Sequence, residues 1–342
     1  MIGYGNSYFV STIVDSGGAP GIAPVNTVAP AITGTAQEGQ TVTCSTGTWT
    51  GTPVISYTYQ WKRNGSNIGS ATNSTYTLVS ADVGQSIKCT VTATNGAGSA
   101  NADSNTITPV AFNQYSMSFD GVDEYAKGGT TFSALDGGNK LTISMWVKVT
   151  SLATSRMLFH IPRNTTQNNG QVLVYLRTTG QLDISVSALT GFMRSNTGVI
   201  TAGNWHHILL CFDLAQATTA QKIRPFVDGV DVYNTANSLG TTFPVSTGAI
   251  WLGEEANGYQ SPFYGNMDEV AIWTSDQRSN AAAIYNSGSP GDLSQLATPP
   301  QHWWRMGDGD TFSTDWTFTD NTGSYNLGSI NMEVGDRVTD VP

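Results

Sequence analysis

The chain has 342 residues and a formal net charge of −10, and a chain of this length is expected to form about two domains. Only 12% of its residues are charged, and Gly, Ser, Thr and Asn take their place, which is typical of an all-β protein with many turns. The acidic balance argues against nucleic acid or an anionic membrane surface as a partner. No run of about 20 apolar residues is present, so we expect no membrane span.

Residues 1–28 are predicted to form an N-terminal attachment arm and linker. Residues 16–21 read Ser-Gly-Gly-Ala-Pro-Gly, a composition that cannot build a core. The apolar residues before them fit either a frayed tail or a peptide that docks on a partner, and the sequence leaves both open. The opening residues lack Lys and Arg, so we expect no secretory leader but a protein made in a host cytoplasm and released by lysis.

Residues 29–110 contain short alternating runs separated by turns, which predict a β sandwich. Cys44, Trp61 and Cys89 follow one another on three of these runs, and Asp82-Val83-Gly84 precedes the last. This order resembles an immunoglobulin domain, although Ile87 stands where that family has a corner tyrosine. The resemblance makes Cys44 and Cys89 candidates for a disulfide, while two reduced thiols packed against Trp61 remain the alternative.

Residues 111–275 contain about ten strand patterns without a helix between them, which predict a larger two-sheet antiparallel sandwich. Five phrases in order resemble the laminin-G-like, concanavalin A-type jelly roll: residues 118–125, 141–147, 203–207, 226–230 and 265–270. This resemblance implies binding of sugar or protein as often as catalysis, because the fold hosts both. Residues 276–342 are predicted to be a C-terminal tail packed on the jelly roll, with one short helix over 276–285.

A structural calcium site is the first candidate site. In laminin-G-like jelly rolls the first and last strands lie side by side, which would bring Asp120 and Asp123 near Asp268. Carboxylate and carbonyl oxygens are the ligands that calcium prefers. The alternative is that Asp120 forms an Asx-turn and that Asp268 accepts hydrogen bonds from neighbouring amides.

A glycan-binding loop is the second candidate site. Residues 258–264 precede the last strand of the jelly roll and contain Tyr259, Phe263 and Tyr264. Aromatic rings stack on the faces of pyranose sugars. Such loops also occur without a ligand, so both interpretations stay open.

No catalytic residues are predicted. His206 and His207 are adjacent on a strand and would point to opposite faces, so the pair cannot bind one metal ion. Glu254 and Glu255 do not alternate along a strand as the carboxylates of glycosidases on this fold do. Cys211 lies in an apolar run and is expected to be a buried small hydrophobic residue.

These expectations favour a non-enzymatic structural protein of a tailed phage virion, because both domains and the tail resemble phage proteins. It would be a decoration, fibre or appendage, anchored to other virion proteins (capsid or tail) through residues 1–28 and facing cell-surface glycans with its jelly roll. Homo-oligomerisation is left open. A bacterial surface adhesin and a secreted protein that binds or hydrolyses glycans are the alternatives.

Overall fold

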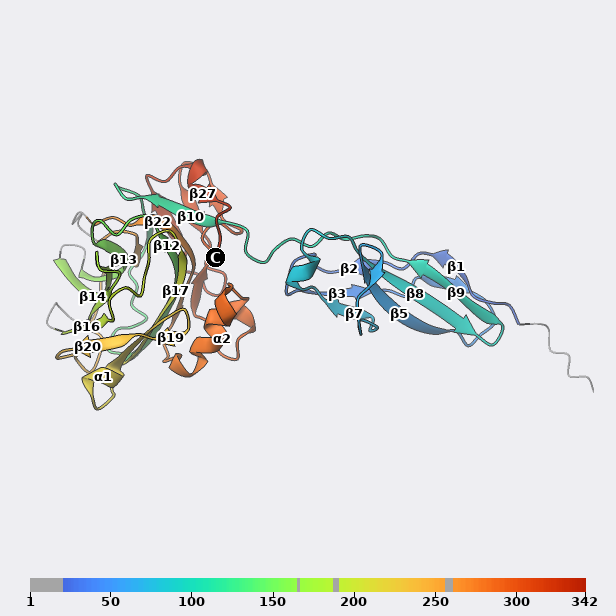
Figure 1. The fold of residues 1–342 in the computed structure, drawn as a ribbon, viewed down its shortest axis with the longest axis horizontal. Coiled ribbons are helices and arrows are strands. Elements are labelled where there is room, and N and C mark those ends of the chain that lie inside the picture. The colour runs from blue at the N-terminus through green and yellow to red at the C-terminus, as the bar shows by residue number, and fades with distance from the viewer. Residues whose placement is uncertain (1–20, 165–166, 187–190, 256–260) are drawn as a thin grey trace, which may run out of the picture. The chain divides into compact units, whose positions relative to one another are not determined.

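The computed structural model describes residues 21–164, 167–186, 191–255 and 261–342. The chain divides into two compact units, with the division between Ala111 and Phe112 (Figure 1). Strands dominate both units, and the two α-helices, α1 (Thr219–Lys222) and α2 (Ala281–Tyr285), are short. The predicted all-β class is therefore confirmed. Among the helices of the described residues, none has the length and apolarity needed to cross a membrane.

The smaller unit packs two sheets against each other. One sheet has the order β2 (Ile32–Thr33), β3 (Thr41–Cys44), β7 (Thr75–Thr77). The other has the order β6 (Ser66–Asn67), β5 (Ser56–Arg63), β8 (Ile87–Asn95), β9 (Gly98–Asp103). A separate pair is formed by β1 (Val25–Val28) and β4 (Thr48–Thr50), and one 3₁₀ turn, η1 (Ser80–Asp82), precedes β8.

Trp61 on β5 is the centre of the smaller unit's core. Its side chain is fully buried and stacks on Tyr76 with 5.4 Å between ring centroids. The indole Nε1 donates a hydrogen bond to the Asn73 carbonyl at 2.9 Å, so burial leaves this polar atom satisfied. Asp82 is equally buried and accepts hydrogen bonds from Tyr76 Oη at 2.9 Å and Arg63 Nε at 2.7 Å.

Cys44 on β3 and Cys89 on β8 belong to the same core as Trp61 and are free thiols. A hydrogen bond between the two thiols lowers the pKa of Cys44, and the same bond together with burial raises the pKa of Cys89. The fold therefore brings Cys44 and Cys89 together, and a disulfide between them stays a prediction.

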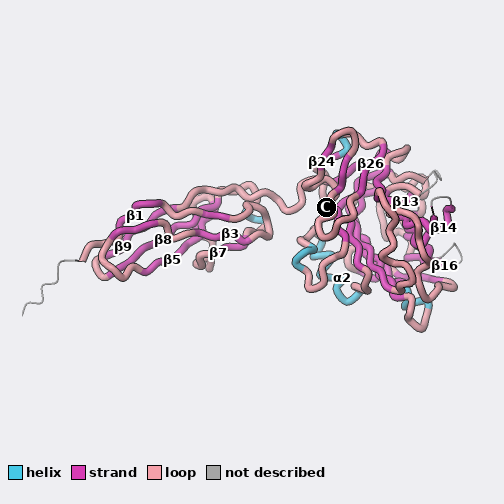
Figure 2. The backbone as a smooth tube through the Cα atoms, turned by 180° about the vertical axis from the view of Figure 1, so that it is seen from behind, coloured by secondary structure: helices cyan, strands magenta, loops and turns pink. Residues whose placement is uncertain are grey.

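The larger unit is a second, larger sandwich (Figures 1 and 2). Within the described residues, its eight-stranded sheet has the order β19 (Val230–Asp231), β18 (Ile223–Val227), β17 (Trp205–Asp213), β12 (Lys140–Val149), β22 (Tyr264–Trp273), β10 (Ser116–Asp120), β27 (Arg337–Val338), with β23 (His302–Trp304) beside β22. Its ten-stranded sheet has the order β20 (Tyr233–Ala236), β16 (Gly191–Ser195), β15 (Leu182–Val186), β14 (Gln167–Leu176), β13 (Arg156–Asn164), β21 (Trp251–Leu252), β11 (Tyr125–Gly128), β26 (Leu327–Ile330), β25 (Trp316–Phe318), β24 (Thr311–Phe312).

The two faces of the eight-stranded sheet are both covered. Its inner face packs against the ten-stranded sheet across the main hydrophobic core. Its outer face carries Leu209, Cys211 and Trp273, which are packed under Ala281 and Ile284 of α2. Cys211 is fully buried there, which confirms its predicted place as a small hydrophobic residue.

The residues predicted to be a C-terminal tail complete both sheets of the larger unit. β23 pairs with β22, and β27 pairs with β10, in the eight-stranded sheet. β26 pairs with β11 in the ten-stranded sheet. Short 3₁₀ turns connect these strands: η2 (Arg278–Asn280), η3 (Asn286–Gly288), η4 (Leu293–Gln295) and η5 (Val334–Asp336). No structural boundary therefore lies at the predicted position between residues 275 and 276.

Candidate functional site

The predicted calcium ligands do not come together. β10 pairs with β22 as expected, but the register places Asp120 opposite Tyr264 and Met117 opposite Met267. Asp268 therefore lies four residues along β22 from the partner of Asp120, a separation on the order of 13 Å at the usual rise of a strand. The described residues contain no group of three or more His, Cys, Asp or Glu side chains that could hold a metal ion. The predicted ligand set of Asp120, Asp123 and Asp268 is wrong.

The alternative interpretation of these acidic residues is confirmed. Asp120 Oδ1 accepts hydrogen bonds from the amides of Val122 at 2.7 Å and Asp123 at 3.4 Å, which is an Asx-turn. Asp268 Oδ1 accepts a hydrogen bond from the amide of Glu269 at 2.8 Å, and its Oδ2 accepts one from Asn113 Nδ2 at 2.7 Å.

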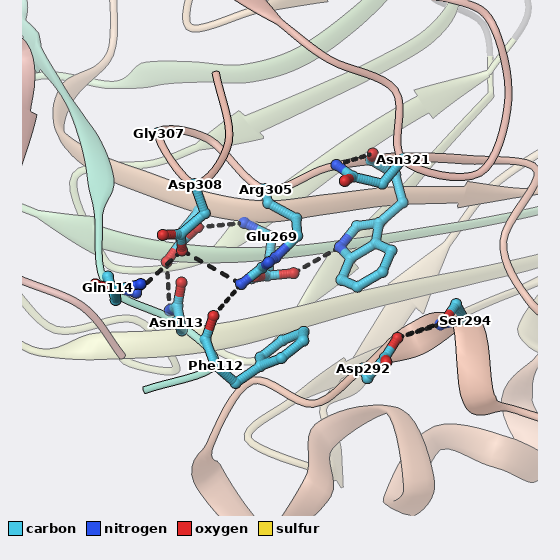
Figure 3. A network of polar contacts seen from close by, with 12 residues as sticks. Phe112, Asn113, Gln114, Glu269, Asp292, Ser294, Arg305, Gly307, Asp308 and Asn321 are labelled. Carbon is cyan, nitrogen blue, oxygen red and sulfur yellow. Dashed lines mark hydrogen bonds and ion pairs between the residues drawn. The ribbon is translucent and has the colours of Figure 1, made fainter. Parts of the chain in front are cut away.

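Glu269, the residue after Asp268, belongs to a buried carboxyl network around Arg305 (Figure 3), and the charges of Glu269 and Asp308 act on Asp268. Arg305 Nε lies 3.2 Å from Glu269 Oε1, while Trp303 Nε1 donates to Glu269 Oε2 at 2.5 Å. Arg305 also contacts Asp308 at 3.4 Å and donates to the Phe112 carbonyl. Asp268 and Glu269 are almost fully buried. Burial raises the pKa of Asp268 well above its ordinary value and that of Glu269 to about 7. This network joins the start of the larger unit to its C-terminal strands and is structural.

Of the three aromatic residues in the predicted glycan-binding loop, the structure describes Phe263 and Tyr264. Tyr259 lies outside the described residues. Phe263 is fully buried, and its ring packs edge-on against Phe119 with 5.6 Å between centroids, so its selection as a surface stacking ring is wrong. Tyr264 is 37% exposed, with the Arg156 guanidinium 5.6 Å from its ring centroid. One predicted ring therefore reaches the surface.

The two adjacent histidines have separate environments. His206 Nδ1 lies 2.7 Å from Asp228 Oδ2, near the surface. His207 is buried, its Nε2 lies 2.8 Å from Ser144 Oγ, and burial lowers its pKa to about 4. Each ring is held by its own structural partner.

A different group of side chains lies on the outer face of the ten-stranded sheet. On β11, Ala126 points into the core, so Tyr125 and Lys127 point outward. On β21, Leu252 points into the core, so Trp251 points outward. Trp251 is paired with Lys127 on one side and with His160 of β13 on the other, which aligns the three in one row across the sheet.

Trp251 is the centre of this row. Tyr125 stacks on it with 4.9 Å between ring centroids and an interplanar angle of 22°. The Lys127 Nζ lies 4.9 Å from the indole centroid, which is a cation–π contact. His160 is fully buried, and that burial lowers its pKa to about 3, so the imidazole is neutral near pH 7. Among Lys127, Trp251 and His160, Lys127 is therefore the residue that carries a positive charge.

A hollow of about 320 Å³ adjoins Trp251. We call it the Trp251 hollow, and its lining is Lys127, Gly128, Gly129, Thr130, Thr131, Pro162, Thr247, Gly248, Ala249 and Trp251. A larger side chain would have different effects at Gly248 and at Gly129. A Cβ on Gly248 would lie 2.3 Å from Pro162 Cγ, so this glycine is required for packing. A Cβ on Gly129 would meet nothing within 4 Å, so its neighbourhood is open.

Two carboxyls lie after β21. Glu255 is buried and accepts a hydrogen bond from the Tyr175 hydroxyl, and burial raises its pKa. Burial also raises the pKa of Glu254, with further contributions from the negative charges of Asp123 and Glu255.

The Trp251 hollow could not be predicted from the sequence. The chain showed Trp251 as one residue of a short apolar run, and only the alternation of Ile250, Trp251 and Leu252 could have placed it on the outer face.

Comparisons with known proteins agree with this architecture. Residues 120–282 match a family model described as the concanavalin A-like lectin/glucanases superfamily. None of the curated proteins compared by sequence matches the chain. A solved structure from Bacteroides ovatus ATCC 8483, described as a candidate carbohydrate binding protein, is 13% identical with a TM-score of 0.52, covering 94% of this chain and 95% of that chain.

Two further structures are similar over about half of the chain. The heptameric SAP-like pentraxin from Limulus polyphemus is 15% identical with a TM-score of 0.40, covering 51% of this chain and 82% of that chain. The CBM40 of the Ruminococcus gnavus IT-sialidase is 12% identical with a TM-score of 0.38, covering 50% of this chain and 97% of that chain. The family match and the two-sheet sandwich together show that the larger unit of this chain has a concanavalin A-like fold.

Proposed function

We propose that the protein binds a carbohydrate in the Trp251 hollow of its concanavalin A-like unit. The observation that carries this proposal is the partly exposed indole of Trp251 beside an open space bounded by threonines. Sugar-binding sites combine an aromatic ring, which contacts the C–H face of the sugar, with a few polar groups that fix its orientation. Trp251 supplies the ring, one face of which is covered by Tyr125. Thr130, Thr131 and Thr247 supply hydroxyls, and Thr131 Oγ1, which donates to the Thr247 carbonyl at 3.1 Å, can still accept a hydrogen bond.

The hollow has dimensions that suit a short glycan. Ligand sites usually have volumes of about 300–1,000 Å³, and the Trp251 hollow falls at the lower end with about 320 Å³. Gly129 leaves open space in the hollow, because a Cβ there would meet nothing within 4 Å, so that a sugar ring can approach the backbone closely at this residue. These features favour recognition of one or two sugar units.

The proposal describes a binding protein without catalytic activity. Glycosidases need two carboxyls that flank the bond to be cleaved. Glu254 and Glu255 are neighbours in sequence, and the carboxyl of Glu255 is engaged by Tyr175. Neither carboxyl is among the residues that line the Trp251 hollow.

We propose a tailed phage virion as the setting, with the smaller unit as an immunoglobulin-like spacer and residues 1–20, which lie outside the described residues, as the attachment arm. The predicted arm of residues 1–28 was too long, because Val25–Val28 form β1 and pair with β4 of the smaller unit. The order of Cys44, Trp61 and Cys89 on strands β3, β5 and β8 supports the immunoglobulin-like assignment. The low charged fraction of 12% also fits a displayed structural protein. Mass spectrometry of purified virions tests this setting, and virions that lack the chain would contradict it.

A glycan array with two matched variants tests the binding proposal. Gly129→Leu adds a side chain in the open space of the hollow, and we expect it to abolish binding without loss of stability. Gly335→Leu adds the same side chain to a glycine of the same unit that also has open space around it, and it should bind normally. Equal binding by both variants, or no binding by the unmodified protein, would contradict the proposal. Thermal unfolding of each variant verifies that the fold is intact.

A further inference from the structure

We infer that the Trp251 hollow selects an anionic sugar, one with a carboxylate or sulfate group, and that Lys127 is the residue that determines this specificity. The inference rests on the proposed carbohydrate binding and adds the class of ligand. Within the part of the chain that the structure describes, Lys127 is the one charged residue that lines the hollow.

The ammonium of Lys127 differs in its partner from those of Lys140 and Lys148, which lie on β12 of the other sheet. Lys140 and Lys148 of the same unit form ion pairs with Asp213 and Asp340. No ion pair joins Lys127 to a carboxylate of the described residues, and its Nζ lies over the Trp251 ring instead. A cation–π contact leaves the outward N–H groups of an ammonium free to donate hydrogen bonds.

The position of this ammonium distinguishes neutral from anionic sugars. A neutral sugar that stacks on Trp251 displaces the Lys127 ammonium from the ring. The cation–π contact is then lost, and no ion pair with the sugar replaces it. An anionic sugar can place its ring carbons along the indole and its charged group on Nζ. A charge-assisted hydrogen bond of this kind is about twice as strong as a neutral one.

The backbone holds Lys127 in this position. The residue is flanked by Ala126, which is buried in the core, and its Cα partners are Trp251 of β21 and Gly328 of β26. Because both neighbouring strands fix the register, the ammonium and the indole stay on the same face of the sheet. Gly328 has no side chain to cover the lysine stem, which leaves Nζ accessible from outside.

The test compares one glycan in two chemical forms. An array with uronate, sialylated, sulfated and neutral glycans identifies the strongest anionic ligand and shows whether the carboxylate or the sulfate is preferred. Titration calorimetry then compares that glycan with its carboxyl-reduced or desulfated form. Lys127→Met keeps the apolar stem and removes the charge, and we expect it to weaken binding of the anionic form by roughly tenfold or more. The neutral form no longer competes with the ammonium for the ring, so it should bind equally well or up to a few-fold more tightly.

Lys88→Met is the matched control, because it removes the same charge from β8 of the smaller unit and should change neither affinity. If the neutral form binds as tightly as the anionic form while Gly129→Leu still abolishes binding, the inference about charge is overturned and the binding proposal stands. If no glycan binds the unmodified protein, the binding proposal falls and the inference falls with it.

Discussion

The buried carboxyl network makes the stability of the larger unit depend on pH in an unusual direction. Burial raises the pKa of Glu269 from 4.5 to about 7. A group whose pKa is raised by folding contributes stability that is fully present below its unfolded pKa and is lost as the pH rises through its folded pKa. Each unit of pKa corresponds to about 1.4 kcal/mol. We therefore expect Glu269 to reduce the free energy of unfolding by roughly 3 kcal/mol between pH 4.5 and 7.

Glu269→Gln tests this expectation, because glutamine has nearly the same shape and does not ionise. One oxygen of Glu269 accepts from Trp303 and the other faces Arg305, so the amide loses one acceptor and the variant is less stable at low pH. Its unfolding free energy should nevertheless fall less steeply than that of the unmodified protein between pH 4.5 and 7. Urea denaturation of the larger unit across this range measures both slopes.

Asp315→Asn is the control for this experiment, since Asp315 is an exposed carboxyl of the same unit. It should leave the slope unchanged. Equal slopes for Glu269→Gln and the unmodified protein would refute the assignment of this pH dependence to Glu269.

Three further predictions concern the smaller unit and the acidic turn. Oxidation that joins Cys44 to Cys89 should raise the unfolding free energy of the smaller unit by about 3–4 kcal/mol. Urea unfolding of the oxidised protein with and without reductant measures this, and equal midpoints would contradict the prediction. Trp61→Ala should cost the same unit about 3–5 kcal/mol, because the indole is fully buried; a loss below about 1 kcal/mol in urea denaturation would show that the core does not depend on it. A chelator should leave the thermal unfolding midpoint of the larger unit unchanged, because Asp268 lies four residues along β22 from Tyr264, the partner of Asp120; an increase on adding calcium would contradict the observed register.

The pairing of β10 with β22 could be predicted from the sequence, but its register could not. The register depends on backbone contacts that no residue pattern shows. Gly265 has φ of +146°, and a Cβ at this position would lie 2.1 Å from the Lys148 carbonyl oxygen. A larger residue at this position could not lie as close to β12, and the β10–β22 register places the residue before it, Tyr264, opposite Asp120. The acidic residues were therefore correctly assigned to paired strands and wrongly assigned to one site.

The aromatic residues show a similar limit. Phe263 and Tyr264 are adjacent in sequence, yet Phe263 is buried and Tyr264 is exposed. Nothing in the loop sequence distinguishes the two orientations, because both rings are large and apolar. Trp251 lies on a strand of only two residues, too short for an alternating pattern to show which face it occupies. The face of the sheet that carries the Trp251 hollow can be identified only when the pairing of β13, β21 and β11 is known.

The sequence did not show that residues 276–342 belong to the two sheets of the larger unit, so a boundary was predicted between residues 275 and 276. The strands β23, β26 and β27 are two to four residues long. Such short segments have weak strand patterns, and their partners lie far away in the sequence. Their place in the two sheets is set by long-range pairing rather than by local propensity.

We propose above that a sugar occupies the Trp251 hollow. A crystal structure of the full chain, bound to the glycan that it binds most strongly on the array, would show directly where the sugar lies. We expect a sugar ring beside the indole of Trp251, with its polar groups on Thr131, Thr247 and the Lys127 ammonium. A sugar bound elsewhere, for example on the exposed ring of Tyr264 with the hollow empty, would contradict it.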